Sequence, residues 1–166
     1  MTATSAKIEH KLDKEISSII RKSKFDKKFL SRKKDISYSE FLSDRLLMIL
    51  VIREGVTYSL FSLIQHLTPF SEQNWANFLD ISTKSLHRYK QNSRRFRPIQ
   101  SEKIIELAEV TKVGLDTFED MDKFKLWLET PNFALGSLRP IELLNDSYGK
   151  ELVVSELTRI NYGILA

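Results

Sequence analysis

The chain has no cysteine among its 166 residues. Without thiol groups it can form neither disulfides nor cysteine metal sites, and it has no cysteine nucleophile. Histidine is scarce too, and His10, His66 and His87 are too dispersed to indicate a metal-ligand set. The sequence also contains no glycine-rich phosphate loop and no paired metal-binding carboxylate motif. We therefore expect no metal, no other cofactor and no catalytic residues, and a function other than that of an enzyme.

Long apolar runs are absent as well. The longest, Leu46 to Ile52, has seven residues and is followed directly by Arg53 and Glu54, whereas a membrane-spanning helix needs roughly 20 apolar residues. The N-terminus carries lysine and glutamate among its apolar positions, unlike a secretory signal. We therefore expect a cytoplasmic protein without a membrane partner, which agrees with the lack of cysteine.

The net charge of +4 is unevenly distributed along the chain. Residues 1–35 carry a net charge of +6, residues 36–100 carry +3 and residues 101–166 carry −5. A basic N-terminal part and an acidic C-terminal part indicate that the two ends of the chain bind different partners, and a polyanion is a candidate partner for the basic end. A gradual drift of surface charge would give the same totals.

Apolar residues recur at helical spacing, and no stretch alternates with a period of two, so we expect an all-α fold. Residues 1–36 are expected to form a basic N-terminal arm. In this arm, residues 6–22 are predicted to be an amphipathic helix, and Arg21 to Asp35 a mobile segment that lies on nucleic acid, on a partner or on nothing. Capping and turn residues, with Ser39 as the first cap, predict further helices. Their expected ranges are 39–54, 57–67, 71–80, 82–91, 101–113, 120–129, 140–144 and 150–160, with Gly55, Gly114 and Gly149 as breaks.

Residues 72–89 have the spacing of a helix-turn-helix, in which two short helices pack steeply across a tight turn. The expected inner face consists of Trp75, Ala76 and Leu79 in the first helix, Ile81 in the turn, and Leu86 and Tyr89 in the second helix. The turn has Asp80 where a glycine is usual. Aspartate tolerates a left-handed backbone better than most residues, so the turn is feasible at some strain.

The second of these helices has the chemistry of a recognition helix. If its apolar residues face inward, its opposite face is basic and hydrogen-bonding, as readout of the major groove requires. Arginines follow the helix at positions where backbone phosphates would run. The candidate DNA-binding residues are Ser82, Thr83, Lys84, Ser85, His87, Arg88, Gln91, Arg94 and Arg95. The alternative is a basic face that is merely solvated.

Residues 117–166 carry a distinctive series of turn and apolar residues. It consists of Trp-Leu at 127–128, Pro-Asn at 131–132, Ala-Leu-Gly at 134–136, Pro140, Leu-Leu at 143–144, Gly149, Leu-x-Arg-Ile at 157–160 and Gly163. This series resembles the toxin-binding domain of Xre/MbcA/ParS antitoxins, and the resemblance extends upstream through the helix-turn-helix to about Ser37. The sequence departs from the family pattern at Ser137, where a second glycine usually stands.

The resemblance implies an Xre-like helix-turn-helix DNA-binding domain over residues 37–116 and a toxin-binding domain over residues 117–166. It implies an antitoxin that covers the active site of a RES-domain toxin, an enzyme that destroys NAD, and that represses its own operon by binding operator DNA. The implied toxin-binding residues are Pro131, Asn132, Gly136, Arg159, Tyr162, Gly163, Ile164 and Leu165. A homodimer, or a larger toxin–antitoxin assembly, is the expected oligomer.

Several alternatives stay open at this point. An apolar C-terminal tail is typical of an interface, but Ile164 and Leu165 could equally pack on their own core. Arg159 is suited to a toxin contact or to an ion pair with Glu156. The whole protein could also be a stand-alone transcription regulator whose C-terminal domain dimerises or binds another protein. A third reading is a pure interaction module whose helix-turn-helix no longer reads DNA, for which Asp80 is the only support.

Overall fold

The computed structural model describes residues 3–22 and 36–163, and these form two compact units. Unit 1 consists of Met1–Leu67 and Ser82–Ile105, and unit 2 consists of Thr68–Ile81 and Glu106–Ala166. The described residues form helices and turns, with no strand among them, which confirms the predicted all-α class. Within these same ranges, no helix has the length and apolarity to cross a bilayer. The predicted functional domains, 37–116 and 117–166, stay a prediction.

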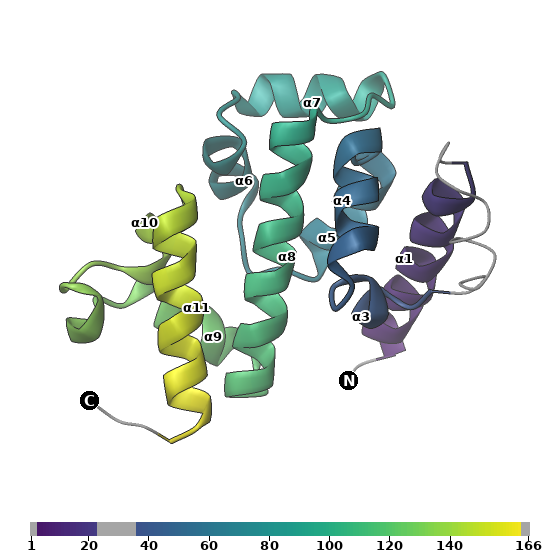
Figure 1. Cartoon of the computed structure of the whole chain (residues 1–166). Coiled ribbons are helices and arrows are strands. Elements are labelled where there is room, and N and C mark those ends of the chain that lie inside the picture. Colours follow the sequence, from purple (N-terminus) through teal and green to yellow (C-terminus); the bar gives the residue numbers. More distant parts are fainter. Residues whose placement is uncertain (1–2, 23–35, 164–166) are drawn as a thin grey trace. The chain divides into compact units, whose positions relative to one another are not determined.

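Unit 1 is built around the packing of its N-terminal helix against three others. Its elements are α1 (Ala3–Lys22), α3 (Tyr38–Phe41), α4 (Arg45–Glu54), α5 (Tyr58–His66), α7 (Thr83–Gln91) and the first part of α8 (Pro98–Phe118) (Figure 1). Helix α1 packs against α3, α4 and α5. Its apolar side is buried, with Leu12 and Ile16 fully enclosed and Ile19 and Ile20 nearly so.

The first part of the predicted N-terminal arm is therefore integral to unit 1. The amphipathic helix predicted over residues 6–22 is present, but it is a core helix because it buries four large apolar side chains. Full burial of such a side chain contributes about 1.5–3 kcal/mol. The mobile segment predicted from Arg21 to Asp35 lies, from residue 23 onward, outside the described residues.

Unit 2 packs a short C-terminal helical array around apolar side chains. Its elements are α6 (Glu72–Phe78), the later part of α8, α9 (Met121–Glu129), the 3₁₀ helix η1 (Phe133–Leu135), α10 (Pro140–Leu143) and α11 (Ser147–Asn161). Helix α11 packs on α10 and η1, and α10 also packs on α9. The inner side of α11 buries Val153 and Leu157, while Phe124, Leu128 and Leu144 line the same core.

Most helix starts follow the predicted caps. Thr57, Ser71 and Ser82 each accept a backbone N–H from the first turn of the following helix through the side-chain hydroxyl. Gly55 ends α4 with a φ of 84°, as predicted. The prediction at Ser39 was wrong, since the segment contains two helices, which are capped by Ser37 and by Asp44.

Two glycines that were predicted to separate helices lie inside them. Helix α8 runs through Gly114, and a Cβ at that position would lie 2.3 Å from the ring of Phe124. Helix α11 begins before Gly149, where a Cβ would lie 1.9 Å from the carbonyl oxygen of Leu143. Both glycines therefore serve close packing between helices, which outweighs their low helix propensity of about 1 kcal/mol relative to alanine.

Candidate functional site

The orientation of α7 in unit 1 is fixed by its inner side. Leu86 is buried, and the Tyr89 ring stacks on Phe96 with the ring centroids 4.4 Å apart and the planes at 3°. The Tyr89 hydroxyl also donates to Oε1 of Gln100 at 3.3 Å. The predicted inward positions of this helix are thus confirmed, so its other side faces solvent.

The loop after α7 is held to the start of α5 within the same unit. The Phe96 N–H donates to the carbonyl of Val56 at 2.8 Å, and the Val56 N–H donates to Oγ of Ser101 at 2.8 Å. Gly55 is required here because a Cβ would lie 2.6 Å from the Phe96 carbonyl oxygen. These bonds and the aromatic stack hold α7 in a defined position on unit 1.

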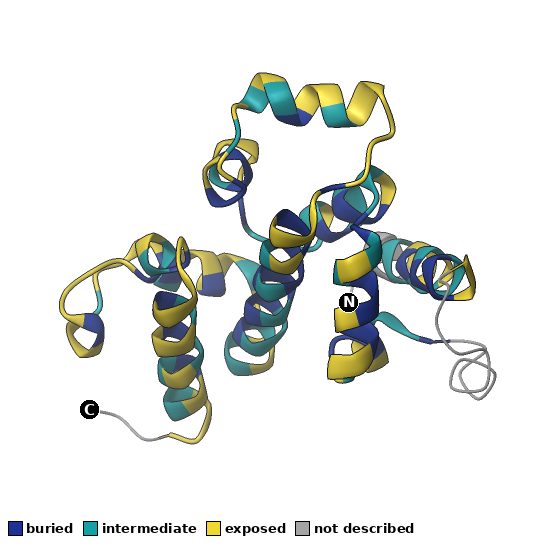
Figure 2. Ribbon diagram, turned by 45° about the horizontal axis from the view of Figure 1, so that its top comes forward, coloured by how far each residue is buried: buried dark blue, intermediate teal, exposed yellow. Residues whose placement is uncertain are grey.

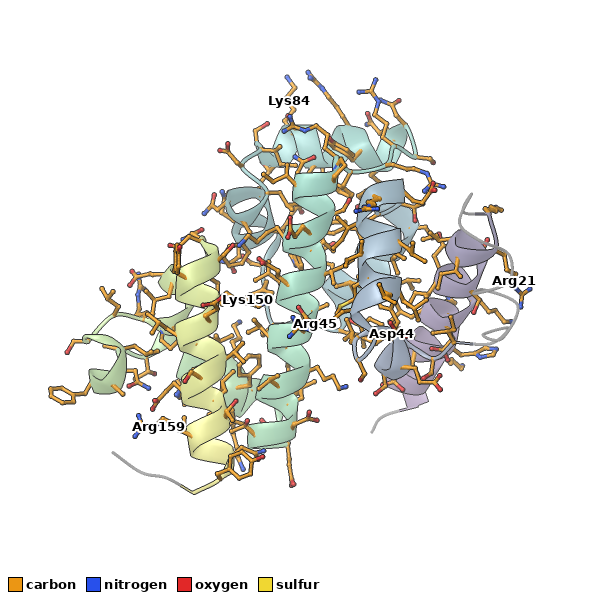
Figure 3. All side chains as sticks on the ribbon, in the orientation of Figure 1. Arg21, Asp44, Arg45, Lys84, Lys150 and Arg159 are labelled. Atoms are coloured by element: carbon orange, nitrogen blue, oxygen red, sulfur yellow. The ribbon has the colours of Figure 1, made fainter. Side chains whose placement is uncertain are left out.

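The outward side of α7 carries most of the candidate DNA-binding residues. Figure 2 shows α7 with exposed residues along its outer side, and in Figure 3 the labelled Lys84 points away from the helix. Thr83 and Ser85 are half-buried. The residues of the candidate set that are exposed are Ser82, Lys84, His87, Arg88, Gln91, Arg94 and Arg95. The structure thus gathers the predicted residues on one helix and the loop that follows it.

Two members of this set have structural roles as well. The Ser82 hydroxyl accepts the Ser85 N–H at 3.1 Å and so caps α7. Nη1 of Arg95 donates to the carbonyl oxygens of Glu54 and Gly55, each at 3.2 Å. The Arg95 guanidinium is therefore partly engaged in holding the end of α4, which sequence reasoning did not foresee.

The turn that precedes α7 has the predicted left-handed aspartate. Asp80 has a φ of 51°, and the following Ile81 N–H donates to the Ala76 carbonyl at 3.0 Å. Trp75, Ala76 and Leu79 are buried, as predicted. The packing of α6 against α7, which the helix-turn-helix motif implies, stays a prediction.

In unit 2, the predicted toxin-binding turn is organised by Asn132. Its Oδ1 accepts the Ala134 N–H at 2.8 Å, its backbone N–H donates to Leu138 at 3.0 Å, and its carbonyl accepts the Ser137 N–H at 2.9 Å. Gly136 and Ser137 follow each other with φ values of 69° and 62°. Ser137 therefore has a left-handed backbone, which a glycine would adopt without strain.

This turn presents an aromatic side chain that sequence reasoning missed. Phe133 is 91% exposed, whereas Leu135 two residues later is buried and anchors the turn. Pro131 is exposed and Asn132 half-buried beside it. A turn with several internal hydrogen bonds thus holds a phenylalanine almost wholly in water.

A second surface runs along the outer side of α11. At 100° per residue, five side chains fall on one stripe of this helix. They are Tyr148, Leu152, Ser155, Arg159 and Tyr162. Tyr148 is 84% exposed and Tyr162 is 76% exposed. We refer to these five residues as the α11 stripe.

Sequence reasoning found only the C-terminal half of the α11 stripe. Gly149 was taken as a break, so Tyr148 was placed outside the helix. The spacing of Tyr148 and Leu152, four residues apart, was the signal that could have found the rest. On the inner side of α11, Nζ of Lys150 lies 3.3 Å from Oε2 of Glu109 on the unit 2 part of α8. In Figure 3 Lys150 points toward α8, whereas Arg159 points away from it.

The ion pair considered for Arg159 is present. Nη1 of Arg159 lies 2.9 Å from Oε2 of Glu156, and 38% of the arginine side chain is exposed. The pair orients the guanidinium and leaves part of it accessible. Gly163 is exposed with a φ of 69°, while Ile164 and Leu165 lie outside the described residues.

A further ion pair lies between the turn and α10. Nε of Arg139 donates to Oε1 of Glu142 at 3.1 Å, and the Arg139 backbone N–H donates to Oε2 at 3.2 Å. These hydrogen bonds lower the pKa of the Glu142 carboxyl below its ordinary value. In the part of the chain that the structure describes, no group of three or more histidines and carboxylates is arranged to hold a metal ion.

Comparison with known proteins connects unit 2 to a toxin-binding domain. Residues 114–163 match the family described as the antitoxin Xre/MbcA/ParS C-terminal toxin-binding domain. A protein named Antitoxin Xre, from Yersinia enterocolitica serotype O:8 / biotype 1B, is 31% identical to the chain over 87 residues. The match covers 52% of this chain and 59% of that relative, so the chain spans less than two thirds of the relative's length.

A solved structure has a similar fold. It is the crystal structure of the M. tuberculosis MbcT-MbcA toxin-antitoxin complex, with a TM-score of 0.54 and 19% sequence identity. The likeness covers 66% of this chain and 96% of the matched chain, and at this identity it concerns the fold alone. Fold and matched domain together define the class, an all-helical protein with a C-terminal segment that matches a toxin-binding domain. Over residues 114–163, the chain is thus similar to the toxin-binding domain of the Xre/MbcA/ParS antitoxins.

Proposed function

We propose that this protein is the antitoxin of a toxin–antitoxin pair and that it binds its toxin through unit 2. One observation carries the proposal. The residues that match the toxin-binding family model, 114–163, contain both the α11 stripe and the exposed Phe133. Exposed apolar side chains that gather on one face, as on the α11 stripe, tend to mark a protein interface.

The composition of this surface is that of a binding hot spot. Tyrosine and arginine are enriched among the residues whose truncation costs most in protein interfaces, and the α11 stripe has two tyrosines and one arginine. The turn around Asn132 is held by its own hydrogen bonds. A pre-ordered turn loses little conformational entropy when a partner covers Phe133, which favours affinity. Helix α11 is suited to lie in an apolar groove of the toxin.

The toxin that we propose has a RES domain and degrades NAD, as the family resemblance implies. Inhibition would be steric, with the surface around Phe133, Arg159 and Tyr162 covering the entrance of the active site. The segment that follows Gly163 would extend this cover.

We further propose that α7 reads operator DNA and represses the operon that encodes both proteins. The supporting observation is an outward α7 side with exposed Lys84, Arg88 and Gln91, side chains that hydrogen-bond base edges in the major groove. A two-fold dimer would place two such helices on the two halves of an operator.

Toxin binding is tested by co-expression with the product of the neighbouring reading frame, co-purification, and an NAD-depletion assay. Leu152→Ala, on the α11 stripe, should weaken toxin binding about tenfold, because burial of a leucine side chain under the toxin would contribute about 1.5–3 kcal/mol. Leu46→Ala is the matched control, since Leu46 is 57% exposed, Leu152 is 54% exposed, and Leu46 lies in unit 1. Equal binding and NAD protection by both variants would refute the role of the α11 stripe.

DNA binding is tested separately. Arg88→Ala should reduce affinity for the operator by about 1–3 kcal/mol and relax preference at one base pair, if Arg88 makes a bidentate base contact. Lys125→Ala, an exposed cation on α9 in unit 2, is the control for loss of one charge. Unchanged operator affinity on loss of both Lys84 and Arg88 would remove α7 from the proposal.

A further inference from the structure

The outward side of α1 carries a row of cations that the proposed function does not use. With 100° per residue, its basic residues and His10 fall within an arc of about 120°. The arc consists of Lys7, His10, Lys11, Lys14, Ser18, Arg21 and Lys22, all exposed except the half-buried Ser18. From Lys7 to Lys22 it extends over about 22 Å of helix. We call it the α1 basic arc.

Two acidic residues of α1, Asp13 and Glu15, accept hydrogen bonds from neighbouring elements. Oδ1 of Asp13 accepts the Tyr38 N–H at 2.6 Å, and Oε1 of Glu15 accepts the Thr57 hydroxyl at 3.0 Å. Glu40 of α3, which faces the arc across a hollow, accepts the Ser37 N–H at 2.8 Å. Asp13 and Glu15 thus join α1 to the start of α3 and the start of α5, and the arc itself carries no acid.

The chemistry of the arc favours a polyanion over a protein partner. Protein interfaces depend on large apolar or aromatic anchors at their centre, and the α11 stripe has them. The α1 basic arc has no large apolar side chain, because Leu12, Ile16, Ile19 and Ile20 are buried on the other side of the helix. Regularly spaced lysines without apolar anchors are typical of contacts with a phosphate backbone.

The position of α1 relative to α7 agrees with this. Both helices belong to unit 1, and the C-terminal end of α1 lies toward the same end of the unit as α7 (Figure 1). In Figure 3 the labelled Arg21 points outward from α1. We infer that the α1 basic arc binds the phosphate backbone of duplex DNA on the flank of the site that α7 reads. This inference rests on the proposed DNA binding by α7.

The test uses the full chain and two duplexes of about three helical turns, one selected by the protein from a random pool and one unselected. Lys7→Gln/Lys14→Gln removes two cations from the arc. Lys123→Gln/Lys125→Gln, on exposed positions of α9, removes the same charge from unit 2. The affinity of each protein is measured across a range of salt concentrations.

Loss of two phosphate contacts should reduce the slope of log affinity against log salt by about 1.8. The ratio of the wild-type DNA affinity to that of the α1 variant should then fall about tenfold as the salt concentration rises from about 50 to 200 mM, on both duplexes. The variant should keep the preference for the selected duplex, and the α9 variant should match the wild type.

Two results would overturn the inference. If the wild type binds the selected duplex and the α1 variant has the same salt slope as the α9 variant, the α1 basic arc does not contact DNA, although α7 still does. If the wild type binds neither duplex, the proposed DNA binding fails together with the inference. Light scattering without DNA provides a third check, since loss of self-association in the α1 variant alone would assign the arc to a second copy of the chain.

Discussion

Gly149 is the position where the structure makes its sharpest prediction about stability. In an unhindered helix, replacing glycine by alanine stabilises by about 1 kcal/mol. Here the added Cβ would lie 1.9 Å from the Leu143 carbonyl oxygen and 2.7 Å from its carbonyl carbon. Both are backbone atoms, so no side-chain rotation relieves the contact, and α10 and α11 must separate.

The cost of that separation follows from the contacts that it disturbs. Overpacking in a core costs about 1–3 kcal/mol. The Gly149 N–H also donates to the capping carboxylate of Asp146 at 2.7 Å, and loss of a cap costs about 1 kcal/mol. Set against the gain in helix propensity, Gly149→Ala should destabilise unit 2 by about 2 kcal/mol, a fall in Tm of about 10 °C for a unit of this size.

Thermal and urea unfolding of the full chain measure this effect. Ser155→Ala is the control, since Ser155 is exposed in the same helix and its replacement should gain a few tenths of a kcal/mol. If Gly149→Ala proves as stable as the wild type, the close approach of α10 and α11 is wrong, and so is the reason given for the glycine.

Three further predictions concern unit 2. Ser137→Gly should raise stability to urea by up to about 1 kcal/mol, because the left-handed backbone at φ 62° costs serine about 1–2 kcal/mol, and Ser137→Val should lower it; the opposite order would exclude strain at this turn. Phe133→Ala should leave the Tm within about 1 °C, because its side chain is 91% exposed and such surface changes are small, yet reduce toxin binding as measured by calorimetry; a large fall in Tm would instead make Phe133 a core residue. Arg139→Gln should raise the pKa of Glu142 toward its ordinary value, as followed by NMR titration, since hydrogen bonds from Arg139 now lower that pKa. Because the pKa of Glu142 is lowered only in the folded state, the ion pair stabilises unit 2 at pH values above the ordinary carboxyl pKa. This contribution is lost as the pH falls through the folded-state pKa of Glu142. An acid-unfolding profile unchanged by Arg139→Gln would contradict this.

The local signals in the sequence were enough to place most helices. A hydroxyl or carboxylate that caps a helix bonds to a backbone N–H within three residues. Thr57, Ser71 and Ser82 therefore predicted the starts of the helices that follow them. The inward positions Leu86 and Tyr89 followed from helical periodicity in the same way. The wrong predictions at Gly114 and Gly149 had a common cause. A glycine that ends a helix and a glycine that allows a neighbouring helix to pack closely look the same in the sequence, because the neighbour in the second case is distant in the chain.

The residues of the candidate sites likewise divide into those that local sequence patterns predict and those whose exposure depends on long-range packing. The exposed residues of α7 were predictable because, in a short basic helix, helical periodicity places the polar residues on the side opposite the few apolar ones. The full α11 stripe was not, because exposure of Tyr148 and Leu152 depends on how α10 and η1 cover the other side of the helix. Phe133 was missed for the same reason, since an apolar residue in a turn of unknown packing is expected to be buried.

The sequence by itself determined the all-helical class, most helix caps, the basic chemistry of α7 and the motif that resembles the toxin-binding domain, because each depends on residues within a few positions of one another. Tertiary structure alone decided that α1 is a core helix, that Gly114 and Gly149 lie inside helices, and which side chains of unit 2 face solvent. Those outcomes depend on contacts between residues far apart in the chain, such as Gly114 with Phe124, which no local pattern specifies.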